Sequence, residues 1–182
     1  MTVGKTHSGK TTFARLSEQR LENSFVMDQD NQAEFINTHY EKLQPKIGPN
    51  NFKNSLSRFI VDYAIENTNL HLIICNSNRS ITNRKTLFDE VFTSEKFIRI
   101  LVNFDIADEI LLNRVKQSER STNIFRGSYS NFEQVLLRQQ KESFKEDIVD
   151  PSIDEAEYLF VIKSNEDVDS VIHEIIQIAK CL

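Results

Sequence analysis

The chain has 182 residues, of which 39% are hydrophobic and 27% charged, and its net charge is −5. This length suits one domain with a buried core, so we expect a single domain over residues 1–182. The acidic balance argues against a protein that grips a long nucleic acid, although a local basic cleft is compatible with it. Apolar runs too short to span a bilayer and only two cysteines, far apart, predict a cytoplasmic protein that has no disulfide and does not bind a membrane.

Near the start of the chain, residues 4–11 read GKTHSGKT and match the spacing G-x-x-x-x-G-K-[ST] of a phosphate-binding loop. The two glycines of the motif permit backbone angles that a side chain forbids, and they let amides approach a phosphate closely. We predict that Lys10 reaches the β- and γ-phosphates of ATP and that Thr11 places its hydroxyl on Mg²⁺. The predicted nucleotide-binding set is Gly4, Lys5, Thr6, His7, Ser8, Gly9, Lys10, Thr11 and Thr12.

Only three residues, Met1 to Val3, precede this loop, which is about half the length of an ordinary strand. Either the first strand is stunted, or the natural chain begins upstream of Met1. We favour the second interpretation. Behind the loop, Phe13, Ala14, Leu16 and Leu21 recur at helical spacing, so a helix opening at Gly9 is expected.

Strands and helices alternate along the rest of the chain. Apolar runs predict strands at 24–28, 70–75, 97–104 and 158–163. Helical periodicity predicts helices at 32–43, 52–68, 84–92, 106–117, 131–144 and 166–182, with loops at 44–51 and 118–130. The inward face of the helix at 52–68 is expected to carry Leu56, Phe59, Ile60, Tyr63 and Ala64. The alternation indicates an α/β fold with a parallel sheet.

The phosphate loop and these elements make the chain resemble the P-loop NTPases, and in particular their small-kinase branch. The resemblance covers nearly the whole length. It implies a three-layer fold, with a five-stranded parallel sheet, helices on both faces and a small lid at about 118–130. It also implies that the carboxyl ends of the strands face the ligands.

Two acids, Asp28 and Asp30, end the strand at 24–28 within VMDQDNQAEF. This stretch resembles the V-x-D-x-D segment of the zeta-toxin-like and polynucleotide-kinase-like P-loop kinases. The resemblance implies that Asp30 takes the proton of the acceptor hydroxyl, and that Asp28 organises Mg²⁺ through water and borders the acceptor. Transfer to an alcohol does require such a base near the γ-phosphate. Alternatively, the two acids only cap the next helix.

The strand at 70–75 ends in Cys75 and Asn76, where many P-loop proteins carry a metal-organising acid. Similar kinases have a polar stretch here that faces the acceptor, which implies a substrate-binding role for Asn76, Asn78 and Arg79. A plain polar turn is the alternative. Asp105 also follows an apolar strand, but we expect it to cap the next helix rather than to organise the metal.

The polar segment RVKQSERSTNIFR at 114–126 resembles the lid of small-molecule kinases. The resemblance implies that Arg120 and Arg126 close over the phosphates during transfer, and that Arg114 contacts the adenine side. Arg138, one helix later, is a weaker candidate for the same group. A solvated basic loop is the alternative interpretation of these arginines.

These features predict an ATP- and Mg²⁺-dependent kinase whose acceptor is an alcohol of a small molecule or of a nucleic-acid end. Two other functions stay open. The first is a nucleotide-binding ATPase that signals to a protein partner and has no acceptor, and the absent acid after Cys75 favours it mildly. The second is a kinase of RNA or DNA 5′ ends, which needs a basic groove beside the acids at 28 and 30.

Overall fold

The computed structural model describes residues 1–127 and 129–181, so positions 128 and 182, which fall in the predicted lid and the predicted last helix, lie outside the description. The strands, in chain order, are β1 (Thr2–Gly4), β2 (Ser24–Asp28), β3 (His71–Cys75), β4 (Ile100–Phe104) and β5 (Tyr158–Ile162). The α-helices are α1 (Lys10–Arg20), α2 (Gln29–His39), α3 (Asn51–Asn67), α4 (Ile81–Glu90), α5 (Asp108–Lys116), α6 (Phe132–Glu142) and α7 (Asp167–Lys180). Two short 3₁₀ helices, η1 (Glu41–Leu43) and η2 (Ile153–Glu155), complete the elements.

The strands are all parallel, but they pair as three plus two rather than as one five-stranded sheet, so that part of the prediction is wrong. One sheet has the order β1-β4-β5, with Thr2 opposite Val102 and Ile100 opposite Tyr158. The other contains β2 and β3, with Ser24 opposite His71.

The two sheets meet between β1 and β3, where the predicted continuous ladder is missing. Because β1 has only three residues, its main chain reaches past the end of β3 instead of pairing along it. The Gly4 amide donates to the Ser77 carbonyl at 2.9 Å, and Asn78 Nδ2 donates to the Thr2 carbonyl at 2.8 Å. These bonds fix the end of β1, and therefore the phosphate loop, against the segment that follows β3.

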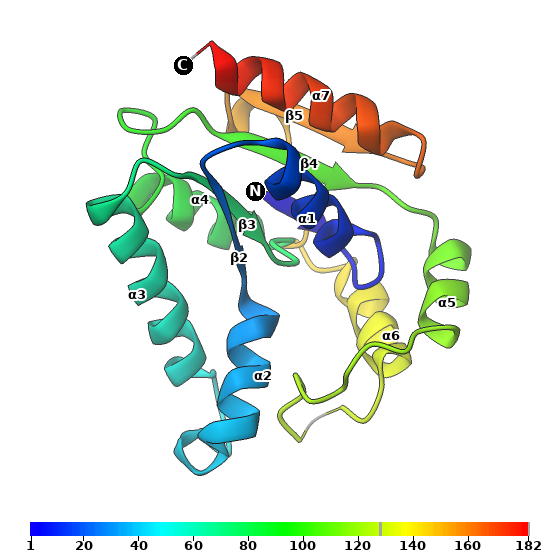
Figure 1. Ribbon diagram of the computed structural model, residues 1–182. Helices are drawn as coiled ribbons and strands as arrows, with labels where there is room; N and C mark the ends of the chain where they lie inside the picture. The colour runs from blue at the N-terminus through cyan, green and yellow to red at the C-terminus, as the bar shows by residue number, and fades with distance from the viewer. Residues whose placement is uncertain (128, 182) are drawn as a thin grey trace.

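Helices cover both faces of the strands, as predicted (Figure 1). Alternate side chains of β4 pack into different apolar clusters on the two faces. Val102 belongs to an apolar cluster with α1, α5, α6 and α7, in which Phe13, Leu111 and Ile172 are buried. Leu101 points the other way, into a cluster with α3 and α4. The pleat of β4 thus separates two halves of the core.

Several helix boundaries and faces differ from the sequence prediction. Helix α2 begins at Gln29, three residues earlier than expected, because the Asp28 carboxylate accepts a hydrogen bond from the Asp30 amide and caps it. Helix α3 buries Ser57, Val61 and Ala64, so its inward face is rotated and the predicted members Phe59 and Tyr63 are exposed; of the other two predicted members, Leu56 and Ile60 are partly buried.

The predicted cap at Asp105 is also wrong. Ala107 is the N-cap of α5, no side chain bonds to that helix end, and Asp105 is exposed. The acids Asp108 and Glu109 lie in the first turn instead, where a helix favours negative charge.

Among the described residues, no helix is both long and apolar enough to cross a membrane.

Candidate active site

A cleft of about 1280 Å³ lies over the carboxyl ends of the strands. It is bordered by the last residue of four of them, namely Asp28, Cys75, Phe104 and Ile162. Ligands of parallel α/β folds bind at this edge. The first residues of helix α1, Lys10, Thr11 and Thr12, border the cleft, so the positive end of the helix dipole points into the cleft.

The loop at 4–11 has the backbone angles that its glycines predict. Gly4 and Gly9 have φ of 149° and 103°, and His7 adopts a left-handed φ of 58°. At Gly4 there is also no room for a side chain, because a Cβ atom would lie 3.0 Å from the Phe104 Cβ and 3.1 Å from the Ser8 Oγ. The loop therefore lies tightly over the end of β4.

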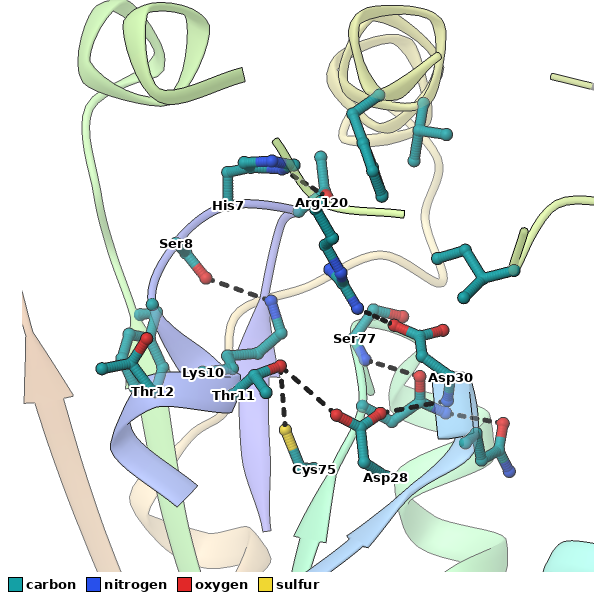
Figure 2. A pocket seen from close by; sticks show the side chains of 18 of the residues that line it. His7, Ser8, Lys10, Thr11, Thr12, Asp28, Asp30, Cys75, Ser77 and Arg120 are labelled. Atoms are coloured by element: carbon teal, nitrogen blue, oxygen red, sulfur yellow. Dashed lines mark hydrogen bonds and ion pairs between the residues drawn. The ribbon is translucent and has the colours of Figure 1, made fainter. Parts of the chain in front are cut away.

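Lys10 points back under the loop, as Figure 2 shows. Its ammonium donates to the Lys5 carbonyl and, at 3.1 Å, to Ser8 Oγ. Burial lowers the pKa of Lys10 to about 8, and Cys75 and Asp30 partly oppose this shift. The amides of Lys10, Thr11 and Thr12 begin α1 and have no acceptor within the helix, so they are available to an anion.

Not every residue of the loop faces the cleft. The Thr6 amide donates to Gln139 Oε1 at 2.7 Å, so this amide already has a partner in α6. The Lys5 ammonium forms an ion pair with Asp108 at 2.6 Å and does not line the cleft. Gly4 does not line the cleft either, and its φ of 149° helps to give the loop its shape.

Thr11 and Asp28 lie side by side at the bottom of the cleft. Thr11 Oγ1 donates to Asp28 Oδ2 at 3.3 Å, and Cys75 Sγ donates to Thr11 Oγ1 at 3.7 Å (Figure 2). Asp28 is 4% exposed, and this burial raises the pKa of its carboxyl group. A hydroxyl and a carboxylate are the oxygen ligands that Mg²⁺ takes, so these two residues fit the ion.

No three His, Cys, Asp or Glu side chains within residues 1–127 and 129–181 gather into a metal site. A magnesium ion here would therefore need oxygen ligands from a bound phosphate and from water. Mg²⁺ in nucleotide-dependent enzymes has this kind of coordination.

Asp30 lies in the first turn of α2, across the cleft from Lys10. Its Oδ2 accepts a hydrogen bond from Arg120 Nη2 at 2.5 Å (Figure 2). The Arg120 guanidinium also lies over the Phe132 ring, 5.2 Å from its centroid. The predicted base and a predicted lid arginine are thus in direct contact, although 90 positions separate them in the sequence.

The segment 118–127 covers the cleft and rests on α2 and on the loop after it. Asn37 Nδ2 donates to the Phe125 carbonyl at 3.1 Å, and Asn123 Nδ2 donates to Thr38 Oγ1 at 2.9 Å. Arg126 Nη2 donates to the Gly48 carbonyl. The described part of the predicted lid has no helix or strand and lies closed against α2 (Figure 1).

Arg114, on α5, marks the other end of the cleft. It donates from Nη1 to the His7 carbonyl at 3.2 Å and from Nη2 to Asn165 Oδ1 at 2.9 Å. Nearby lining residues are mostly apolar: Leu16, Ile106, Ile162 and Val168. An apolar slot with one amide side chain suits a nucleobase.

Most of the predicted site residues border this cleft, namely Thr6, His7, Ser8, Gly9, Lys10, Thr11, Thr12, Asp28, Asp30, Asn76, Arg114, Arg120 and Arg126. Asn78 and Arg79 are not among the lining residues. Asn78 has φ of 45° and bonds to β1, while Arg79 donates to Ser143 Oγ. Asn76 does border the cleft, and its side chain donates to Gln29 Oε1 at 2.9 Å.

Lys53, Gln139 and Asn165 are among the polar residues that border the cleft but escaped the sequence prediction. Lys53 lies in the first turn of α3, and burial lowers the pKa of its ammonium group. Gln139 and Asn165 act on the phosphate loop through Thr6 and Arg114. No local pattern in the sequence distinguishes these three residues from other polar residues of the chain.

No protein-family model matches the chain, and no curated protein matches it in sequence. Solved structures do match it over nearly its whole length. A shikimate kinase from Bacteroides thetaiotaomicron has a TM-score of 0.56 at 13% identity, covering 98% of this chain and 96% of that one. A kinase candidate from Chloroflexus aurantiacus has a TM-score of 0.62 at 15% identity, covering 99% and 94%.

The fold is that of the small P-loop kinases. At these identities the likeness concerns the fold alone. The resemblance to the zeta-toxin and polynucleotide-kinase branch stays a prediction, because neither of these two structures belongs to it by name.

Proposed function

We propose that the protein is an ATP- and Mg²⁺-dependent phosphotransferase that moves the γ-phosphoryl group to an alcohol. The observation that carries the proposal is the pairing of two halves in one cleft. Lys10 and the start of α1 form an anion site on one side, and Asp30 lies on the other side, bonded to Arg120 of the lid. Kinase names among proteins of the same fold support the same reaction.

The nucleotide would lie with its base in the slot near Asn165 and its phosphates on the amides that begin α1. Lys10 would exchange its contacts with Ser8 and the Lys5 carbonyl for phosphate oxygens, because these neutral acceptors attract a cation less than an anion does. Thr11 and Asp28 would hold Mg²⁺, which neutralises charge that develops on the phosphates.

In the transfer, the acceptor oxygen forms a bond to the γ-phosphorus while the bond from that phosphorus to the β,γ-bridging oxygen breaks. The hydroxyl proton passes to the Asp30 carboxylate, and ADP leaves with the bridging oxygen. Arg120 bonds to Asp30 in the structure and can reach an anion beside it, so it would stabilise the moving phosphoryl group.

One observation favours the alternative of an ATPase without an acceptor. Cys75, which is 2% exposed, occupies the position where many P-loop proteins have a metal-organising acid, and burial raises the pKa of its thiol. A thiol in its neutral form is a poor ligand for Mg²⁺. Weak metal binding would slow transfer, although Asp28 supplies a carboxylate at the same place.

The test is a screen with γ-labelled ATP and Mg²⁺ against sugars, sugar phosphates, hydroxy acids, nucleosides, nucleotide sugars and oligonucleotides with free 5′ hydroxyl groups. We expect label on one class of alcohol, and no label with Lys10→Ala. Label found only as free phosphate would contradict a transferase and favour the ATPase. Lys180→Ala, on the exposed end of α7, is the matched control and should behave as the wild type.

A further inference from the structure

The cleft is rich in cations although the chain as a whole carries a net charge of −5. Three carboxylates line it, and six basic side chains do so: Lys10, Lys53, Arg114, Arg120, Arg126 and Arg138. An excess of buried or half-buried cations is costly unless anions bind among them. One triphosphate at the phosphate loop would satisfy the cations on that side of the cleft.

Most of these cations already have a contact that explains their position. Arg120 bonds to Asp30, Arg114 bonds to Asn165, and Lys10 bonds to the phosphate loop. Arg138 lies over the Tyr129 ring at 5.0 Å and faces Glu142 at 3.9 Å.

Lys53 and Arg126 differ from the others. Within residues 1–127 and 129–181, no hydrogen bond or ion pair is found for the Lys53 ammonium, and the Arg126 Nη1 atom is buried without a partner. The other terminal nitrogen of Arg126, Nη2, donates to the Gly48 carbonyl, so this bond does not satisfy Nη1. A buried donor without a partner costs on the order of 1–3 kcal/mol, so Arg126 Nη1 points to a ligand. The Lys53 ammonium borders the same cleft and can bind the same ligand.

These two cations lie close together, on the side of the cleft away from the phosphate loop. Lys53 comes from the first turn of α3, just after its N-cap Asn50, and Arg126 comes from the lid. Burial lowers the pKa of Lys53 most, Asp30 raises it, and Arg126 lowers it further, as a neighbouring like charge does. Lys53 and Arg126 are therefore near Asp30, and the fold holds these two positive charges close together although they repel each other.

We propose that the acceptor is an alcohol that already carries a phosphate group, which Lys53 and Arg126 bind while its hydroxyl group faces Asp30. This inference rests on the proposed function and gives Arg126 a part in acceptor binding rather than in catalysis. A phosphate monoester carries about −1.5 to −2 charges and three acceptor oxygens, so it matches two cations from two elements. A carboxylate would leave one of the two charges uncompensated.

The experiment measures binding with saturating Mg²⁺ and a non-hydrolysable ATP analogue, so it needs no turnover. Ribose 5-phosphate, ribonate, ribose and inorganic phosphate serve as probes, and the midpoint of thermal unfolding and titration calorimetry are the readouts. The variants are Lys53→Met and Arg126→Met, with Lys42→Met in the exposed η1 as the matched control.

We expect the phosphorylated probes to bind wild type and Lys42→Met alike, and to bind each of the other two variants at least about tenfold more weakly. The proposal is overturned if ribonate or ribose binds as tightly as the phosphate ester. It is also overturned if no phosphorylated probe binds, or if Lys53→Met binds them as the wild type does. Failure of the proposed function would look different: the phosphate ester would bind, but it would receive no label from γ-labelled ATP.

Discussion

The two halves of the cleft are built in different ways. In the nucleotide half, the anion site is one continuous segment, residues 4–12, formed by main chain and one lysine. The acceptor half is assembled from α2, the loop at 44–50, α3 and the lid, through side chains that are 78 to 90 positions apart in the sequence, such as Arg126 on Gly48 and Arg120 on Asp30. A local motif thus identifies the first half, whereas only the folded chain reveals the second.

The largest expected effect on the rate of phosphoryl transfer is at Arg120, where the two halves of the cleft meet. Replacing it with Met should lower the rate of phosphoryl transfer by about 10³–10⁵-fold, because it removes the cation that would stabilise the moving group. Binding of ATP with Mg²⁺ should change little, since the phosphate loop stays intact. Arg58→Met, which removes an exposed arginine of α3, is the control for rate and binding. Equal rates in the Arg120 variant and the wild type would contradict this role.

Asp30→Asn should affect the acceptor half of the cleft and leave the nucleotide half unchanged. The amide cannot take the proton of the acceptor, so transfer should fall by about 10²–10⁴-fold. The rise in unfolding temperature with ATP and Mg²⁺ should persist, because binding to the native state stabilises it by linkage. Asp154→Asn, at an exposed position of η2, is the control. Loss of the ATP-dependent rise in Asp30→Asn would mean that the halves are not separable.

Gly4 lies in the nucleotide half and Gly48 in the acceptor half. Replacing each with Ala shows, through the free energy of unfolding, how tightly the chain is packed there. Gly4→Ala would place a Cβ 3.0 Å from Phe104 at φ of 149°, so we expect a loss of roughly 3 kcal/mol in the free energy of unfolding. Gly48→Ala has φ of 84° and nothing within 4 Å of its Cβ, so only about 1 kcal/mol should be lost. Urea unfolding measures both, and equal losses would contradict the tight fit of the phosphate loop.

The last prediction concerns the pH dependence of stability at His7, which appears only in acid. Burial, with Arg120, Lys10 and Arg114 nearby, lowers the pKa of His7 from 6.5 to about 4. Between these two values the unfolded chain binds the proton and the folded chain does not, so stability should fall as the pH drops from 6.5 to 4. His7→Asn keeps a residue that tolerates φ of 58°, and it should lose less stability than the wild type over this range. If the free energy of unfolding changed with pH in the same way for His7→Asn and the wild type, the lowered pKa of His7 would be contradicted.

Residues 6–12 of the nucleotide half do border the cleft, where the sequence predicted them, because spacing in a loop and apolar strand runs are local signals. Their role in nucleotide binding stays a prediction. It predicted the acceptor half only in outline. Asp30, Arg120 and Arg126 border the cleft, and their predicted roles stay predictions. Lys53 was missed, since one lysine in an amphipathic helix has no distinguishing pattern. The face of α3 was misplaced because Phe59 and Tyr63 are apolar yet exposed.

The division of the strands also lay beyond the sequence. A five-stranded sheet needs β1 to pair on both edges, and whether three residues suffice depends on how the end of β3 meets them. In the structure that contact is made by Ser77 and Asn78, after the strand has ended. No local pattern encodes this contact between distant segments.

Titration calorimetry with a non-hydrolysable ATP analogue and Mg²⁺ measures whether residues 4–12 hold a nucleoside triphosphate. We expect saturable binding of one equivalent to the wild type and no detectable binding to Lys10→Ala, while Lys180→Ala behaves as the wild type. Absence of binding to the wild type, or equal affinity in Lys10→Ala, would contradict the claim.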